Sequence, residues 1–178
     1  MISALGFKSI LTTSETAEKC GIANFETKPI LYCKNISGTV ETSTAEVPDM
    51  KAVYELFCSC FPSSYIRNKD SYLSWLSDFT FRRNRSLARI EMAFCGSKIV
   101  AAALTSAECE NGAVISSVAC DKEFRLNGFG KAVSLSLAQK LQAENKNVFV
   151  IAENNELSAF YKKIGFKDCG FAAYIERH

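Results

Sequence analysis

Histidine is almost absent from this sequence: among 178 residues the only one is His178. A Ser-His-Asp or Cys-His catalytic device needs an imidazole that its surroundings hold in place. A terminal residue is commonly frayed and offers no such support. The sequence therefore argues against a hydrolase of either kind. Because it also has no Cys-x-x-Cys pair, it gives little support for a zinc site, and we expect no metal.

An excess of charge of one sign and long apolar runs are also lacking. The chain has 21 Lys and Arg against 19 Asp and Glu, for a net charge of +2. That charge is too small to indicate a nucleic-acid partner. No apolar run approaches the roughly 20 residues of a membrane span, and residues 1–10 show no signal-peptide pattern. We therefore expect a cytoplasmic protein with neither a nucleic-acid nor a membrane partner.

Cysteine, in contrast, is abundant, with eight residues scattered along the chain. A chain of this length does not need disulfides to be stable. Several of the cysteines fall inside apolar segments, where a free thiol behaves as a small hydrophobic group. We expect reduced and mostly buried thiols rather than a disulfide framework.

Hydrophobic periodicity predicts a mixed α/β fold with hairpins followed by alternating strands and helices. The strand at 113–119 is apolar along its length, so we expect it to be covered on both faces. The expected helices are 14–21, 48–60, 71–81, 128–142 and 157–164, and the expected strands are 29–34, 38–44, 87–94, 98–106, 113–119, 148–152 and 171–175.

The segment from Val118 to Lys131 contains a candidate phosphate site. A predicted strand ends, a polar loop follows, and Gly128 and Gly130 open a helix. The first-turn N–H groups of a helix lack internal partners and, with the helix dipole, attract anions. Glycine removes side chains that would keep a phosphate from the backbone, and Arg125 and Lys131 add positive charge. The segment suits a pyrophosphate, although glycines at a helix start also occur as plain turn residues.

Two other phosphate motifs do not fit this segment. The dinucleotide motif Gly-x-Gly-x-x-Gly fails because Val133 stands at its third glycine. The nucleotide-hydrolase loop fails because Arg125 replaces its first glycine and Ala132 its hydroxyl residue. The pattern that remains is Arg-x-x-Gly-x-Gly.

A second segment completes a resemblance to a known family. Asn154 follows a predicted strand, and the short helix after it reads Tyr161-x-x-x-Gly165-Phe166. Together with the Arg-x-x-Gly-x-Gly loop, this order of motifs resembles the GNAT superfamily of N-acetyltransferases over about residues 38–178. The resemblance implies the GNAT fold, a mixed and mostly antiparallel central sheet flanked by helices, with residues 37–178 as the GNAT domain.

The resemblance also implies a cosubstrate, acetyl-coenzyme A (acetyl-CoA), and an acceptor, a primary amine of a small molecule or peptide. Backbone groups near Val118 would pair with the pantetheine arm, and the loop 125–131 would hold the pyrophosphate. Asn154 would contact the cofactor or order water. The residues implied to bind the cofactor are Ser117, Val118, Ala119, Arg125, Leu126, Asn127, Gly128, Phe129, Gly130, Lys131 and Asn154.

Tyr161 matches the family's usual general acid, which would protonate the departing thiolate. The strand at 113–119 lacks the carboxylate that often serves as the base, so Glu153 is the base that we name. Three simpler interpretations stay open: Tyr161 packs in the core beside Phe160, Asn154 caps a helix, and Glu153 is a solvated surface residue. The predicted function is acetyl transfer to an amine. The alternatives are a non-catalytic binder of acetyl-CoA or CoA with this fold, and a protein-interaction module without a cofactor.

Residues 1–36 form an N-terminal extension with a sequence echo. The letters LGFK at 5–8 resemble IGFK at 164–167, and each precedes a strand-like stretch near a tyrosine, Tyr32 and Tyr174. We hypothesise that the extension is a remnant of a preceding GNAT-like domain; a plain extension or a truncated chain are the alternatives. It would add a strand to the sheet or pair with a second subunit in a homodimer.

Overall fold

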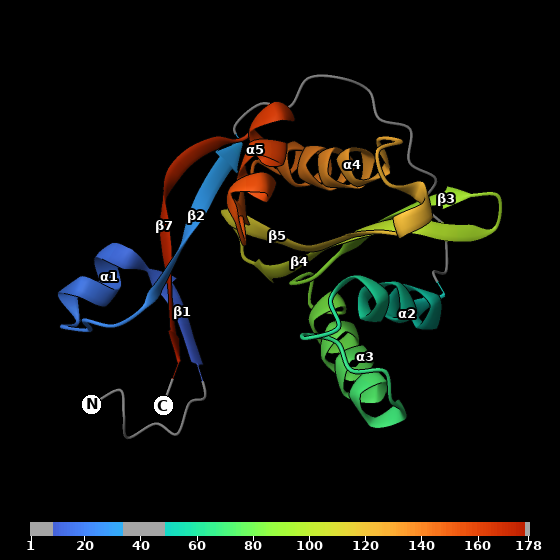
Figure 1. The fold of residues 1–178 in the computed structure, drawn as a ribbon, viewed down its shortest axis with the longest axis horizontal. Helices are drawn as coiled ribbons and strands as arrows, with labels where there is room; N and C mark the ends of the chain where they lie inside the picture. Colours follow the sequence, from blue (N-terminus) through green and yellow to red (C-terminus); the bar gives the residue numbers. More distant parts are fainter. Residues whose placement is uncertain (1–8, 34–48, 177–178) are drawn as a thin grey trace. The chain divides into compact units, whose positions relative to one another are not determined.

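The computed structural model describes residues 9–33 and 49–176. These residues fall into two compact units, the smaller formed by residues 9–33 and 149–176 and the larger by residues 49–148 (Figure 1). The elements in chain order are β1 (Ser9–Thr13), α1 (Ser14–Lys19), β2 (Glu26–Cys33), α2 (Met50–Cys60), α3 (Lys69–Arg83), β3 (Ile90–Cys95), β4 (Lys98–Glu108), β5 (Gly112–Cys120), the 3-10 turn η2 (Lys122–Phe124), α4 (Phe129–Ala143), β6 (Asn147–Ile151), α5 (Asn155–Lys163) and β7 (Lys167–Glu176). The predicted mixed α/β class with mostly antiparallel strands is confirmed.

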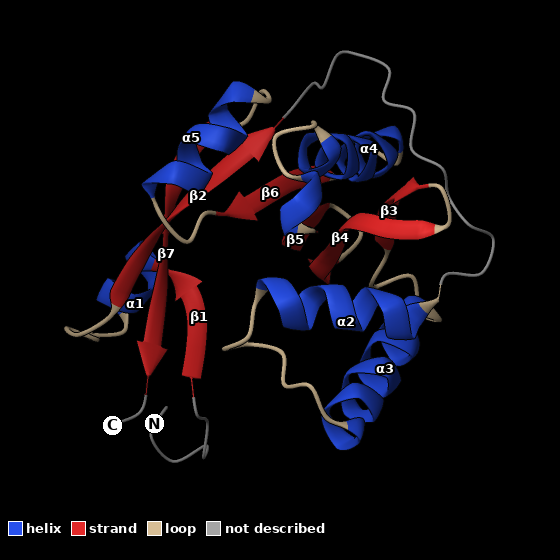
Figure 2. Cartoon of the chain, turned by 45° about the vertical axis from the view of Figure 1, so that its right-hand side comes forward, coloured by secondary structure: helices blue, strands red, loops and turns tan. Residues whose placement is uncertain are grey.

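The larger unit is a three-layer arrangement built on strands β3, β4 and β5. Both neighbouring pairs, β3 with β4 and β4 with β5, are antiparallel. Helix α4 packs on one face of these strands, and α2 with α3 lies on the other (Figure 2). Val53 and Phe57 of α2 are fully buried in a core cluster with Met92 and Leu104 of the strands. Burial of such side chains, each worth about 1.5–3 kcal/mol, holds the helix to the sheet.

Capping residues decide where the first two helices of the larger unit begin. The Asp49 side chain accepts hydrogen bonds from the N–H groups of Lys51 and Ala52, so α2 begins at Met50. The expected start at residue 48 lies outside the described residues. Asn68 likewise accepts from the Ser71 N–H, which starts α3 at Lys69, before the predicted position. Each cap satisfies an N–H group that the helix itself leaves unpaired.

Strand β5 is less covered than its composition suggests. Ala113, Ile115 and Ala119 are buried, but Val114 and Val118 are only half-buried. The prediction that both faces would be covered was therefore wrong. An apolar run shows that a strand can be buried, whereas the helices packed against it determine how much of each face they reach.

In the smaller unit, β7 lies between two antiparallel partners, β1 and β2. Ala17 of α1 is fully buried against Ala173 and Ile175 of β7. The backbone N–H of Ala152 donates to the Pro29 carbonyl at 3.0 Å, which joins the N-terminal residues to the end of β6. Residues 9–33 are thus an integral part of this unit's packing. The sequence echo at 5–8 and the expected strand at 38–44 lie outside the described residues, so the domain-remnant hypothesis stays a prediction.

All eight cysteines are free thiols, as predicted. The expectation that most would be buried was wrong, since four of them are exposed. Three of these stand where regular structure ends: Cys20 caps the C-terminus of α1, Cys95 ends β3, and Cys109 follows β4. At the end of a helix or strand, a side chain is open to solvent. The exposed cysteines are Cys20, Cys95, Cys109 and Cys169.

Candidate functional site

The loop between β5 and α4 has the backbone form expected of a phosphate site. Gly128 is the N-cap of α4 with a φ of +85°, and no side chain caps this helix. The first intrahelical bond runs from the Ala132 N–H to the Gly128 carbonyl at 2.9 Å. The N–H groups of residues 129–131 come before this bond, and no side chain caps them. A Cβ added at Gly128 or Gly130 would meet nothing within 4 Å, so the space before the turn is open.

Positive charge gathers at this turn. The Arg125 guanidinium is exposed and donates from Nε to the Cys120 carbonyl at 3.3 Å, which fixes it at the end of β5. Burial raises the pKa of the neighbouring Cys120 thiol, and the charge of Arg125 opposes this increase. Lys131 in the first turn of α4 is also exposed.

The remaining loop residues shape the turn. Leu126 has a φ of +65° and a fully exposed side chain, so it contributes to the turn through its backbone conformation. The Asn127 amide donates to the Arg125 carbonyl at 3.3 Å. The Phe129 ring lies edge-on to Phe124, with 6.2 Å between the centroids. These contacts hold the loop without covering the start of α4.

Strand β5 is irregular where the resemblance implies contact with pantetheine. Ser117 and Val118 together oppose the single residue Ala103 of β4, which makes a β-bulge. Ser117 has a φ of +46°, in the left-handed region that a serine rarely adopts. The bulge interrupts the ladder directly beside the half-buried Val118, and the regular pairing resumes at the buried Ala119.

Sequence reasoning missed a hydroxyl pair at this bulge. The Tyr65 hydroxyl, from the loop between α2 and α3, lies 2.8 Å from the Ser117 hydroxyl. Both side chains are half-buried. The two residues are far apart in the chain, and nothing in the spacing of the sequence announces their contact.

The other predicted site residues lie in the smaller unit. Glu153 pairs with Lys28 at 2.8 Å, and its side chain is 66% exposed, which favours the surface interpretation. The Asn154 side chain accepts from the Leu157 N–H at 2.9 Å and is the N-cap of α5. The capping interpretation of Asn154 is therefore confirmed, and a cofactor contact would be an additional role.

Tyr161 is buried, with 6% of its surface exposed. Its ring packs edge-on against Phe160 and Phe166, with centroids 5.2 and 5.6 Å away. Burial raises the pKa of the phenol to about 12. The hydroxyl therefore keeps its proton well above neutral pH, as a proton donor must.

Replacing Asn154 by alanine separates its two roles. Loss of the cap is expected to lower the free energy of unfolding by about 1 kcal/mol, measured by urea denaturation. Asn68→Ala is the matched control, because Asn68 is an exposed N-cap of α3 with the same geometry. If Asn154 also binds the cofactor, only Asn154→Ala weakens acetyl-CoA binding; equal affinities in both variants would leave capping as its sole role.

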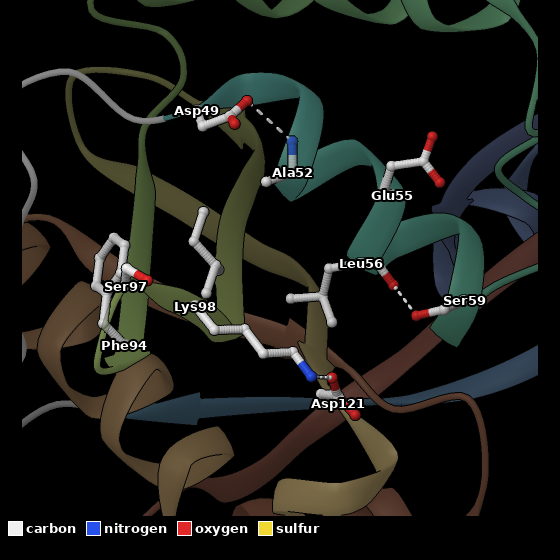
Figure 3. Close-up of a pocket in the computed structure, with 10 residues that line it drawn as sticks. Asp49, Ala52, Glu55, Leu56, Ser59, Phe94, Ser97, Lys98 and Asp121 are labelled. Atoms are coloured by element: carbon white, nitrogen blue, oxygen red, sulfur yellow. Dashed lines mark hydrogen bonds and ion pairs between the residues drawn. The ribbon is translucent and has the colours of Figure 1, made fainter.

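A cavity of about 510 Å³ opens beside α2 and the β3–β4 hairpin (Figure 3). Lys98 reaches across it to Asp121 at 2.7 Å, and Asp49 caps α2. Glu55, the third acid on its wall, pairs with Arg67. The charged groups of this cavity are thus already paired with one another or with the chain. Within residues 9–33 and 49–176 there is no cluster of metal-ligating side chains, and no helix there is long and apolar enough to cross a bilayer.

Comparison with known proteins finds the same fold in other proteins. The family model for FR47-like proteins matches residues 95–174. A GCN5-related N-acetyltransferase from Kribbella flavida has a TM-score of 0.66 at 11% identity over 94% of this chain and 67% of its own. A GNAT-family acetyltransferase from Colwellia psychrerythraea has a TM-score of 0.69 at 11% identity over 96% and 65%. This chain thus spans about two thirds of the length of these two proteins.

A shorter protein matches over its whole length. The PaiA N-acetyltransferase of Thermoplasma acidophilum, solved in complex with coenzyme A, has a TM-score of 0.53 at 17% identity, covering 79% of this chain and 100% of its own. Comparison with curated proteins gives no match.

The fold is that of GNAT-family acetyltransferases of known structure. The predicted resemblance is confirmed at the level of the fold, and the model for FR47-like proteins matches residues 95–174.

Proposed function

We propose that this protein transfers an acetyl group from acetyl-CoA to a primary amine. The observation that carries the proposal is the uncapped turn at Gly128, with open space before it and Arg125 and Lys131 exposed beside it. The FR47-like segment and the likeness to a coenzyme A complex support the same cofactor. Cytoplasmic location and a homodimer stay predictions.

In this proposal the residues of the larger unit bind the cofactor. The first-turn N–H groups of α4, with Arg125 and Lys131, neutralise the pyrophosphate. The backbone of Val118, freed from regular pairing by the bulge, hydrogen-bonds the pantetheine arm. The positive charge suits a diphosphate, and the free backbone groups suit the amides of the pantetheine arm.

The reaction needs two proton movements. The amine must be neutral to attack the thioester carbonyl, and the carbon–sulfur bond then breaks as the thiolate departs. We assign protonation of that thiolate to Tyr161, which burial keeps protonated. Glu153 is the base that we name, and its ion pair with Lys28 must open before it accepts a proton.

Calorimetry with acetyl-CoA, followed by thiol release over a panel of amines, tests the proposed function. Binding with amine-dependent release supports a transferase. Binding without release on any amine, including peptides, would favour the non-catalytic binder. Absence of binding would contradict the proposal as a whole.

Replacing Tyr161 by phenylalanine is expected to lower kcat about 100-fold while acetyl-CoA binding is kept, because general acid catalysis typically contributes that much. The pKa of about 12 predicts no alkaline loss of this acid below about pH 11. Tyr32→Phe is the matched control, since Tyr32 packs against Phe149 in the same unit at 5.3 Å. An unchanged kcat in Tyr161→Phe would remove Tyr161 as the acid.

A further inference from the structure

The Tyr65–Ser117 pair has hydrogen-bonding capacity left over. Two hydroxyls carry two protons, and the 2.8 Å contact uses one of them, whichever residue donates it. Tyr65 also has a hydrogen bond with the Trp75 side chain, whose indole N–H can only donate and so occupies one lone pair. One O–H and the other lone pairs of the two hydroxyls remain. Since both side chains are half-buried rather than enclosed, a ligand can reach them.

The surroundings of the pair are aromatic. The Tyr65 ring lies 5.1 Å from Phe57, 5.8 Å from Tyr54 and 6.2 Å from Phe61. Trp75 packs against both Tyr54 and Phe57 and belongs to the same cluster. Phe57 and Tyr54 are buried in the core, so an amine that reaches the hydroxyls lies against the half-buried rings of Tyr65, Phe61 and Trp75.

The strand that carries Ser117 supplies no negative charge, since β5 has no acidic residue along Gly112–Cys120. Arg82 on α3, the cation whose charge acts on Tyr65, is already paired with Asp78 at 2.8 Å. Burial is the main influence on Tyr65 and raises its pKa. An apolar wall likewise disfavours an ammonium ion and lowers the pKa of an amine placed there.

We propose that Tyr65 and Ser117 bind the amino group of the acceptor, and that the aromatic wall selects monoamines with an aromatic or branched apolar body over polycations. An amine N–H donates to a hydroxyl oxygen of the pair, which leaves the nitrogen lone pair free to attack. The ammonium proton is lost to solvent as the amine enters, and Glu153, the base named above, accepts the proton that the nitrogen releases after its attack on the thioester. The reaction then does not require a carboxylate base on strand β5. The inference rests on the proposed acetyl transfer.

The test compares Tyr65→Phe with wild type in thiol release from acetyl-CoA. For 2-phenylethylamine the variant's KM is expected to rise about tenfold, the worth of one hydrogen bond, with kcat changed less than about twofold and acetyl-CoA affinity unchanged. Tyr72→Phe is the matched control, because Tyr72 lies in the same aromatic cluster, packed on Tyr54 and Trp75. Its KM is expected to equal that of wild type.

A second variant and a second amine class complete the design. Ser117→Gly removes the other hydroxyl and suits the positive φ, so it is expected to fold and to raise KM similarly. Wild type is expected to show at least a tenfold higher kcat/KM for 2-phenylethylamine and isoamylamine than for spermidine or an aminoglycoside.

The outcomes separate this inference from the function on which it rests. Acetyl-CoA binding with an unchanged KM in Tyr65→Phe and Ser117→Gly would overturn the acceptor site alone. Preference for spermidine would overturn the substrate class. Failure of wild type to bind acetyl-CoA would overturn the proposed function and, with it, this inference.

Discussion

Replacement of Gly128 by aspartate is expected to abolish acetyl-CoA binding, with an affinity loss of more than about 100-fold. Gly128 is the N-cap of α4 without a capping side chain, and the space around its α-carbon is open. A carboxylate there occupies the proposed phosphate position and repels the diphosphate. Calorimetric titration with acetyl-CoA measures the loss.

Two further variants isolate the charge from the backbone effect. An asparagine side chain has the shape of aspartate without its charge, and Gly128→Asn must adopt the same φ of +85°, at a folding cost of about 1 kcal/mol. This variant is therefore expected to keep more affinity for acetyl-CoA than Gly128→Asp. Gly96→Asp places the acid at a φ of +60° in the β3–β4 turn and is expected to bind like wild type. If Gly128→Asp also bound like wild type, the phosphate-loop assignment would be wrong.

The second large effect concerns stability: Glu108→Ala is expected to lower the free energy of unfolding by about 3 kcal/mol. The Glu108 side chain is fully buried and pairs with both Arg89 and Lys146. These cations are themselves mostly buried, and without Glu108 they face each other with less compensation. Two charges left in a medium of low dielectric cost more than the lost contacts alone. Urea denaturation measures the change.

The comparison for this variant is Glu15→Ala on α1. Glu15 pairs with Lys19 one helical turn away, but the two side chains are 75% and 73% exposed. Water and salt screen such a pair, so its removal is expected to cost less than about 0.5 kcal/mol. Equal losses in the two variants would show that burial of the Glu108 network contributes nothing beyond a surface pair.

Much of the fold could be predicted because apolar spacing reports local structure directly. The helices at 71–81, 128–142 and 157–164 were each found within a few residues, and the hairpin around Gly96 was placed correctly. Their starts were less accurate, since Asn68 could be recognised as a cap only once the chain direction before α3 was known. The prediction that both faces of β5 would be covered was wrong, because it depends on how neighbouring helices pack and not on the sequence of the strand.

The candidate site divides in the same way. The candidate phosphate loop has its glycines and cations within seven residues, so the sequence could propose it together with the Tyr161–Phe166 motif, and the left-handed φ of Gly128 is compatible with that proposal. The contact between Tyr65 and Ser117 could not be predicted, because the two residues lie 52 positions apart and meet only at a bulge. A bulge arises from the pairing of two strands, and one strand's sequence does not encode its register.

The position of β7 has a consequence for the order of folding. Both of its neighbours, β1 and β2, come from residues 9–33, whereas β7 ends at Glu176. On the ribosome these early strands emerge long before their partner exists, and they wait with unpaired edges that other chains can bind. Contacts of such sequence separation also slow folding, because a long loop must close first. The larger unit, built from consecutive residues, can form meanwhile, so we expect the smaller unit to be the late and aggregation-sensitive step of biogenesis.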